Sequence, residues 1–251
     1  MVKGLDIFRG HFSGFYDQYT VIGGTACDLA MEGAGLEFRA TKDIDLVLCV
    51  ETLSEDFTRE FWKFIAAGGY EHRQKSDGEP QFYRFKTPKD DEFPFMIELF
   101  SKVPNQIEFE GEGHITPIPT EEEVSSLSAI LLREDYYQLI HENKRIVEEL
   151  PTLGPEHLIV LKARAFVDLT KRKNDGEDVD SKDVKKHRND VFRLNLLLPS
   201  DINISLPEAI RSDLDEFFDM VSADEVPLRN LGYANLKFDE VVAQLKVKYS
   251  S

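Results

Sequence analysis

Two aspartates, Asp43 and Asp45, are separated by a single residue at the start of an apolar strand candidate, Asp43–Val50. Successive side chains of a β-strand alternate between faces, so both carboxylates would leave one face while the apolar residues face the core. Two like charges on one face repel each other, and a divalent cation relieves that repulsion. Carboxylate oxygens are suitable ligands for Mg²⁺ or Mn²⁺. The alternative is an edge strand with a solvated acidic face.

A third acid, Glu98, interrupts another apolar strand candidate, Met96–Phe100. A glutamate within such a run needs a partner or water. If this strand lies beside the one with Asp43 and Asp45, three carboxylates share a site. Such a site can hold two metal ions and stabilise the attacking and leaving oxygens of a displacement at phosphorus. The alternative is that Glu98 pairs with an arginine, for instance Arg84.

A pair of glycines, Gly23 and Gly24, follows a short β-branched run, Tyr19–Ile22, and precedes a helix predicted over Thr25–Met31. Glycine lets the backbone approach a phosphate without a side-chain clash. The helix would direct its free N–H groups and the positive end of its dipole toward that phosphate, and Thr25 could add a hydroxyl. Without other motifs, two glycines after a strand indicate a tight turn.

The remaining pattern predicts an α+β protein with a mixed β-sheet and flanking helices, followed by a helical C-terminal domain. Up to residue 153, predicted strands alternate with helices. We expect helices after Ser54 and over 135–141, and strands over 81–85, 93–100, 107–110 and 145–150; residues 127–132 fit either type. After the segment Pro151–Pro155 the predicted elements are helical. We therefore predict a sheet domain over 1–153 and a helical domain over 154–251 that closes the cleft, with residues 171–181 as an exposed loop.

Composition restricts the classes of function. The chain has 251 residues with a formal net charge of -17, so it repels nucleic acid and anionic lipid on average. No apolar run approaches the length of about 18 residues that a membrane span needs, and we expect no membrane partner. The cysteines, Cys27 and Cys49, follow or precede apolar residues, which favours reduced thiols and a cytoplasmic protein. Neither Ser-His-Asp nor Cys-His catalysis has a supporting pattern.

Together these motifs resemble a known group of proteins. The glycine pair, the segment Arg39-x-Thr41-x-Asp43-x-Asp45 and a later strand with one acid are similar to the nucleotidyltransferase superfamily of DNA polymerase β. Within it, the chain resembles the AbiEii/AbiGii family of nucleotidyltransferase toxins. Three further segments carry this resemblance: 128–132, 158–165 and 181–194. The resemblance covers roughly residues 15 to 198.

The resemblance implies roles for individual residues. Nucleotide binding would fall to Gly23, Gly24, Thr25, Arg39 and Thr41, and metal binding to Asp43, Asp45 and Glu98. Catalytic roles would fall to Asp43, Asp45, Lys162 and Asp183, with Lys162 reaching the nucleotide phosphates and Asp183 positioning or deprotonating the acceptor. The family pairs two acids in its tail. Lys186 stands near the expected second one, and Asp190 is the candidate replacement.

Without the family resemblance, two interpretations remain open both for Lys162 and for the basic segment around it. Lys162 lies near the apolar stripe of a predicted helix, where it either reaches a triphosphate or extends its ammonium into water at the stripe's edge. Residues 162–188 contain nine Lys or Arg and six Asp or Glu. This basic segment either guides an RNA end or triphosphate or is a solvated surface.

The resulting prediction is a Mg²⁺- or Mn²⁺-dependent nucleotidyltransferase. It would transfer NMP from an NTP to an acceptor hydroxyl and release pyrophosphate. The resemblance implies a tRNA 3′ end as acceptor, growth arrest as the outcome and an antitoxin as partner. Two alternatives stay open: transfer to a small molecule of aminoglycoside type or to a protein hydroxyl, which suits the acidic surface, and a non-catalytic nucleotide-binding module.

Overall fold

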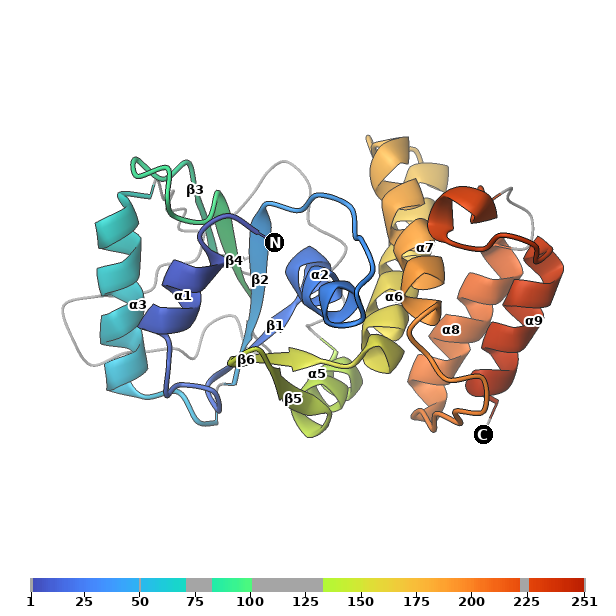
Figure 1. Ribbon diagram of the computed structural model, residues 1–251, viewed down its shortest axis with the longest axis horizontal. Coiled ribbons are helices and arrows are strands. Elements are labelled where there is room, and N and C mark those ends of the chain that lie inside the picture. The colour runs from blue at the N-terminus through green and yellow to red at the C-terminus, as the bar shows by residue number, and fades with distance from the viewer. Residues whose placement is uncertain (1, 50, 71–82, 101–132, 222–225, 251) are drawn as a thin grey trace. The chain divides into compact units, whose positions relative to one another are not determined.

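The computed structural model describes residues 2–49, 51–70, 83–100, 133–221 and 226–250, with the side chains of Tyr83 and Arg84 excepted. The predicted strand over 107–110 and the segments 127–132 and 81–82 lie outside the described residues. The chain divides into two compact units, one comprising the described residues up to Leu153 and the other those from Gly154 onward. The predicted α+β class is confirmed, since a mixed sheet with flanking helices precedes a run of helices (Figure 1).

A six-stranded sheet forms the centre of the first unit, with the strand order β3-β4-β2-β1-β6-β5. The pairs β1–β2, β3–β4 and β5–β6 are antiparallel, whereas β2–β4 and β1–β6 are parallel. The bounds of the strands are β1 Tyr19–Ile22, β2 Asp43–Leu48, β3 Tyr83–Lys86, β4 Met96–Phe100, β5 Lys144–Val147 and β6 Leu150–Leu153.

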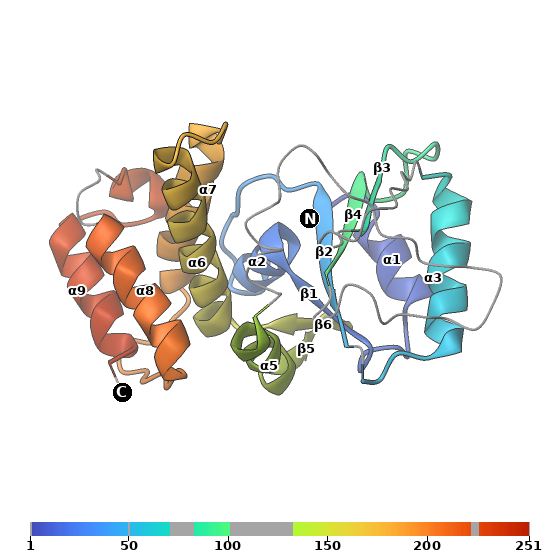
Figure 2. The same ribbon diagram turned by 180° about the vertical axis from the view of Figure 1, so that it is seen from behind.

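Helices cover both faces of this sheet. The helices of the first unit are α1 Leu5–His11, α2 Gly23–Gly33, α3 Glu55–Gly68 and α5 Glu134–Glu142. Figures 1 and 2 show α1 and α3 on one side of β2 and α2 on the other. On the α1/α3 side, the Tyr19 ring of β1 contacts Phe8 and Phe57. The sheet therefore has an apolar face toward α1 and α3, and its opposite face is covered in part by α2.

The helix predicted after Ser54 is confirmed as α3. The Ser54 hydroxyl accepts a hydrogen bond from the Phe57 N–H at 3.2 Å, which satisfies a donor that the first turn would otherwise leave unpaired. The helix is closed by the residue after it, Gly69, which adopts a left-handed conformation with φ 61°. Phe57, Phe61, Phe64 and Ile65 recur at helical spacing and are buried, with ring contacts to Phe8 of α1 and Tyr19 of β1.

One strand prediction is wrong. Residues 145–150 were expected to form a single strand, but the chain turns at Glu148 and Glu149 and continues as the next strand, β6. Both glutamates have positive φ, 47° and 59°. Two successive left-handed residues make the tight hairpin turn that asparagine and glycine usually provide. Nothing in a Glu-Glu pair indicates such a turn.

The second unit is helical. Its helices are α6 Pro155–Asn174, α7 Ser181–Asn195, α8 Glu208–Val221 and α9 Phe238–Lys248, with a short 3₁₀-helix over Leu228–Leu231. Pro155 occupies the first helical position, where its missing N–H costs nothing. The exposed loop expected over 171–181 is shorter than predicted, because α6 continues to Asn174. Basic residues in the last turn of α6 favour this continuation through the helix dipole. Among the described residues no helix is long and apolar enough to cross a membrane.

Candidate active site

The turn between β1 and α2 requires a glycine at its first position. Helix α2 begins at Gly23, which has φ +69°, a conformation that residues with a side chain rarely adopt. A Cβ on Gly23 would overlap the carboxylate of Asp45. The residue before the helix, Ile22, has no polar side chain to cap the first-turn N–H groups. The Asp45 carboxylate therefore lies directly against the start of α2.

Gly24 permits a second close approach. A Cβ there would lie 2.5 Å from Thr41 Oγ1 and 3.6 Å from Arg39 Nη2. Arg39, Thr41, Asp43 and Asp45 are spaced two residues apart, and the segment carrying them runs past the first turn of α2. A cationic guanidinium, a hydroxyl and a carboxylate thus gather at one helix start, where the dipole is positive.

The Thr25 hydroxyl bonds to the backbone of β2. Its side chain is fully buried, and its Oγ1 donates a hydrogen bond of 2.5 Å to the main-chain oxygen of Asp43. The hydroxyl proton is therefore engaged with β2 rather than directed at an external phosphate. The part of Thr25 that remains suited to phosphate binding is its main-chain N–H at the helix start.

The strand carrying Glu98 lies beside the strand carrying the aspartates, as expected. In the parallel register of β2 and β4, Asp45 is paired with Glu98 and Asp43 with Met96. Neighbouring residues in register point to the same face, so all three carboxylates belong to the face opposite α1 and α3. The alternating apolar residues of β2, such as Ile44 and Leu46, are buried on the other face.

The three acids differ in exposure. Asp43 and Asp45 are partly exposed, whereas Glu98 is 8% exposed. Arg84 is paired with Glu98 in the antiparallel β3–β4 register, and its side chain lies outside the described part of the chain. The predicted Glu98–Arg84 contact therefore stays a prediction. Among the described residues, no three His, Cys, Asp or Glu side chains are arranged to hold a metal ion together.

These residues nevertheless fit a Mg²⁺ or Mn²⁺ ion shared with a substrate. Magnesium is usually held by one or two carboxylates together with phosphate oxygens, rather than by a cage of protein ligands. Asp43 and Asp45 supply two partly exposed carboxylates of the required type on one strand face. A site in which the two aspartates hold the ion is compatible with the geometry, and the predicted role of Glu98 as a third ligand stays a prediction. The metal itself stays a prediction.

In the second unit, Lys162 has a buried acidic partner. Lys162 on α6 is 3% exposed, and its Nζ lies 3.7 Å from Oδ2 of Asp190 on α7. Asp190 is fully buried, and its Oδ1 accepts a hydrogen bond of 3.2 Å from Arg193. The alternative in which Lys162 extends its ammonium into water is wrong. Its predicted reach to nucleotide phosphates stays a prediction.

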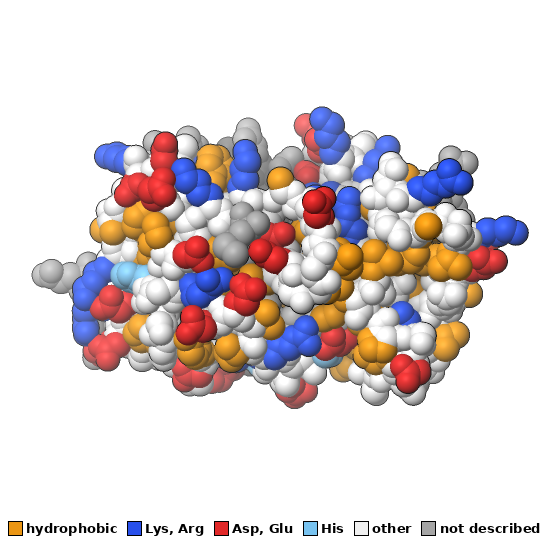
Figure 3. Space-filling model, in the orientation of Figure 1, with side chains coloured by type: hydrophobic (Ala, Val, Ile, Leu, Met, Phe, Trp, Pro, Cys, Tyr) orange, Lys and Arg blue, Asp and Glu red, His pale blue; other side chains and the backbone are white. Residues whose placement is uncertain are grey.

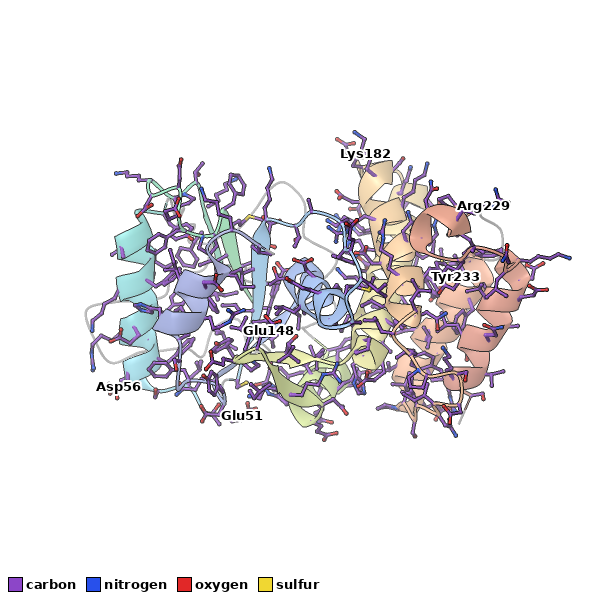
Figure 4. The ribbon with its side chains drawn as sticks, in the orientation of Figure 1. Glu51, Asp56, Glu148, Lys182, Arg229 and Tyr233 are labelled. Atoms are coloured by element: carbon purple, nitrogen blue, oxygen red, sulfur yellow. The ribbon has the colours of Figure 1, made fainter. Side chains whose placement is uncertain are left out.

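Asp183 and its basic neighbours lie near the start of α7 and are more exposed. Asp183 lies 3.6 Å from Lys186, one turn later, in a solvent-exposed ion pair. Elsewhere in the basic segment, Lys171 pairs with Glu216 and Arg172 with Glu177. Lys182 extends from the start of α7 (Figure 4). Most of the positive charge that the sequence places here is therefore matched by nearby acids.

Sequence reasoning missed a buried polar network in the second unit. Lys248 donates hydrogen bonds to Asn195 Oδ1 and to the Leu198 carbonyl, and Asn195 donates to the Tyr233 hydroxyl. Burial lowers the pKa of Lys248 and raises the pKa of Tyr233 to about 12. These residues come from separate helices and the loop before α9, so no local pattern could have linked them. They hold the helices together and offer no evident reactive group.

Comparison with known proteins adds little to this geometry. No protein-family model matches the chain, and no curated protein matches it in sequence. A solved structure described as an antigenic nucleotidyltransferase-like protein from Paracoccidioides brasiliensis is similar in fold, with 13% identity and a TM-score of 0.48. The match covers 97% of this chain and 90% of that chain. Because both the sequence identity and the TM-score are low, any functional argument must rest on the residues of this chain.

Proposed function

We propose that this protein is a metal-dependent nucleotidyltransferase that transfers NMP from an NTP to an acceptor hydroxyl and releases pyrophosphate. One observation carries the proposal: the Asp45 carboxylate lies against Gly23 at the start of α2, with Asp43 and Glu98 on the same sheet face. Groups that attract phosphate and groups that attract a divalent cation are thus neighbours. A metal–nucleotide complex needs both kinds of group.

The phosphate side of the proposed site is the start of α2. The main-chain N–H groups at Gly24 and Thr25 and the Arg39 guanidinium would bind the triphosphate oxygens. Thr41 Oγ1, beside Gly24, is placed to add a hydrogen bond. The absence of a Cβ at both glycines lets the Asp45 and Thr41 side chains approach the start of α2 closely.

The acidic side is formed by Asp43 and Asp45, with Glu98 beside them. The aspartates would hold Mg²⁺ or Mn²⁺, which neutralises charge on the phosphates and favours ionisation of the acceptor hydroxyl. Glu98, being more buried, would orient or restrain its neighbour Asp45. The roles of Lys162 and Asp183 follow from the family resemblance alone.

Three further details of the proposal also come from the family resemblance. They are membership of the AbiEii/AbiGii type, a toxin role with an antitoxin partner, and the tRNA 3′ end as acceptor. A specific observation favours a second candidate acceptor: the formal charge of -17 suits a cationic small molecule better than RNA. The basic segment around α7 is the feature that favours RNA.

The test is transfer of label from α-³²P-NTPs in Mg²⁺ or Mn²⁺ to total tRNA, to aminoglycosides and to protein. We expect labelled tRNA, with activity reduced at least about 100-fold in Asp45→Asn and Asp43→Asn. Asp56→Asn is the matched control, because Asp56 is an exposed acid at the start of α3 that pairs with Arg59 (Figure 4). Label in a small molecule or in protein, with none in RNA, would support the second candidate. No metal-dependent NTP binding by calorimetry, with Asp43→Asn indistinguishable from wild type, would contradict the proposal.

A further inference from the structure

Strand β2 extends beyond the strand that pairs with it. The register of β1 with β2 ends at Ile22 and Asp45, and the chain enters α2 at the next residue. Asp43 lies two residues further and is paired with Met96 of β4 on its other side. On the β1 side, no residue of β1 is paired with Asp43. Asp43 is therefore paired with β4 on one side and lies beyond the end of β1 on the other.

On the side of Asp43 that lies beyond β1, Thr25 forms a hydrogen bond to the backbone. Its hydroxyl donates the 2.5 Å hydrogen bond to the Asp43 carbonyl, and its side chain is fully buried. Because water has no access to Thr25, water cannot replace its hydroxyl as the donor without rearrangement of the protein. Threonine is branched at Cβ, which restricts χ1 and holds the hydroxyl toward the strand. The bond thus joins the first turn of α2 to the first residue of β2.

We propose that Thr25 is a positioning residue that fixes Asp43 and Asp45 relative to the start of α2. The bond acts on the backbone of Asp43, so it sets the direction from which the Asp43 carboxylate leaves the strand. It complements the close packing of Asp45 against Gly23 two residues later. This inference rests on the proposed function, because it assigns Thr25 to the metal-binding side of that site rather than to the phosphate.

The test measures Mn²⁺ binding in the presence of a non-hydrolysable NTP analogue, by electron paramagnetic resonance of free Mn²⁺. Thr25→Val keeps the shape and removes the donor, so we expect a dissociation constant raised about 5- to 10-fold, the factor that corresponds to one hydrogen bond. Thr25→Ser keeps the hydroxyl and should restore binding to within about 2-fold of wild type. Asp43→Asn should abolish the binding.

Thr152→Val is the matched control. Thr152 is also buried in the first unit, and its hydroxyl donates at 3.0 Å to the carbonyl of Val21 on β1, and not to the strand that carries the aspartates. It should lose stability as Thr25→Val does, without a change in Mn²⁺ affinity. If Thr25→Val does not fold, Thr25→Cys, with its weaker S–H donor, takes its place.

The outcomes separate the two proposals. Wild-type protein that binds Mn²⁺, with Thr25→Val binding equally well, would overturn the inference and leave the proposed function standing. Equal losses of affinity in Thr25→Val and Thr152→Val would also overturn it, because the effect would then be general destabilisation. Wild-type protein that neither binds Mn²⁺ nor transfers label would overturn the proposed function and this inference with it.

Discussion

Gly23 is the residue on which the candidate site depends most directly. Both its positive φ and the Asp45 carboxylate exclude a side chain there. We predict that Gly23→Ala lowers the free energy of unfolding by about 1–3 kcal/mol and displaces Asp45, with loss of nucleotidyl transfer. Chemical denaturation and the labelling assay measure the two effects.

Gly33, at the other end of the same helix, is the matched control. A Cβ there would have no heavy atom within 4 Å, and its φ is not positive. Gly33→Ala should therefore leave activity unchanged and raise stability by up to about 1 kcal/mol. If Gly23→Ala retained full activity, the close approach of Asp45 to the helix start could not matter for function.

The buried pair of Lys162 and Asp190 has consequences for stability whatever the role of Lys162 in catalysis. Asp190→Leu would leave a buried ammonium without its carboxylate, so we predict a loss of about 3–5 kcal/mol in the free energy of unfolding. The double variant Lys162→Met/Asp190→Leu should recover most of this loss, because the buried ammonium is removed together with its carboxylate, and Arg193, the other partner of Asp190, is partly exposed. Asp183→Asn, which breaks an exposed pair, should cost less than about 1 kcal/mol. Urea denaturation measures the free energy of unfolding of each variant. Equal losses in Asp190→Leu, the double variant and Asp183→Asn would contradict the assignment of Lys162 and Asp190 as a buried ion pair.

At the scale of elements, the sequence was informative where a pattern is local. Alternation in Asp43–Leu48 predicted which face carries the acids, and the glycine pair predicted the strand-to-helix turn, because both depend on adjacent residues. The neighbouring position of Glu98 was a conditional inference from one polar residue in an apolar strand. Pairing between distant elements, such as Lys162 with Asp190, has no local signal. The turn at Glu148 and Glu149 escaped prediction because its residues are not those that favour positive φ.

Helix α6 also carries an acid whose environment predicts a pH effect. Burial raises the pKa of Asp168, more than the nearby Arg164 and Arg172 lower it, and its Oδ2 is buried with no hydrogen-bond partner in the described part of the chain. A carboxyl whose pKa is higher in the folded state than in the unfolded state favours folding below its unfolded pKa of about 3.9. This advantage is lost as the pH rises through the folded-state value.

We therefore predict that Asp168→Asn has a higher melting temperature than wild type at pH 7. The difference should narrow as the pH falls below about 4, where the wild-type carboxyl becomes protonated in both states. Melting curves at one-unit pH intervals test this, with Asp201→Asn as a control at an exposed position. A lower melting temperature for Asp168→Asn at pH 7 would show that the arginines outweigh burial.

At the scale of the whole molecule, charge decides between the candidate acceptors. The chain carries 47 acidic and 30 basic residues, and Figure 3 shows both signs interspersed on the face in view. An RNA acceptor therefore needs local cations that are not already paired with acids. Lys182 and Lys185 are exposed on α7, and no ion pair joins either to another described residue. Lys171, Arg172 and Lys186 nearby already pair with acids.

If the acceptor is RNA, these two lysines should contribute to its binding through phosphate contacts. We predict that Lys182→Glu/Lys185→Glu raises KM for tRNA about 10-fold or more, and leaves KM for the NTP unchanged. It should also reduce the slope of log affinity against log salt by about 2, one for each lost phosphate contact. The charge-matched control is Lys3→Glu/Lys63→Glu in the first unit, which changes the net charge equally at exposed lysines. Equal effects of the two double variants would assign the loss to overall charge. No effect of either, in an active enzyme, would point to an acceptor that α7 does not recognise and favour the cationic small molecule.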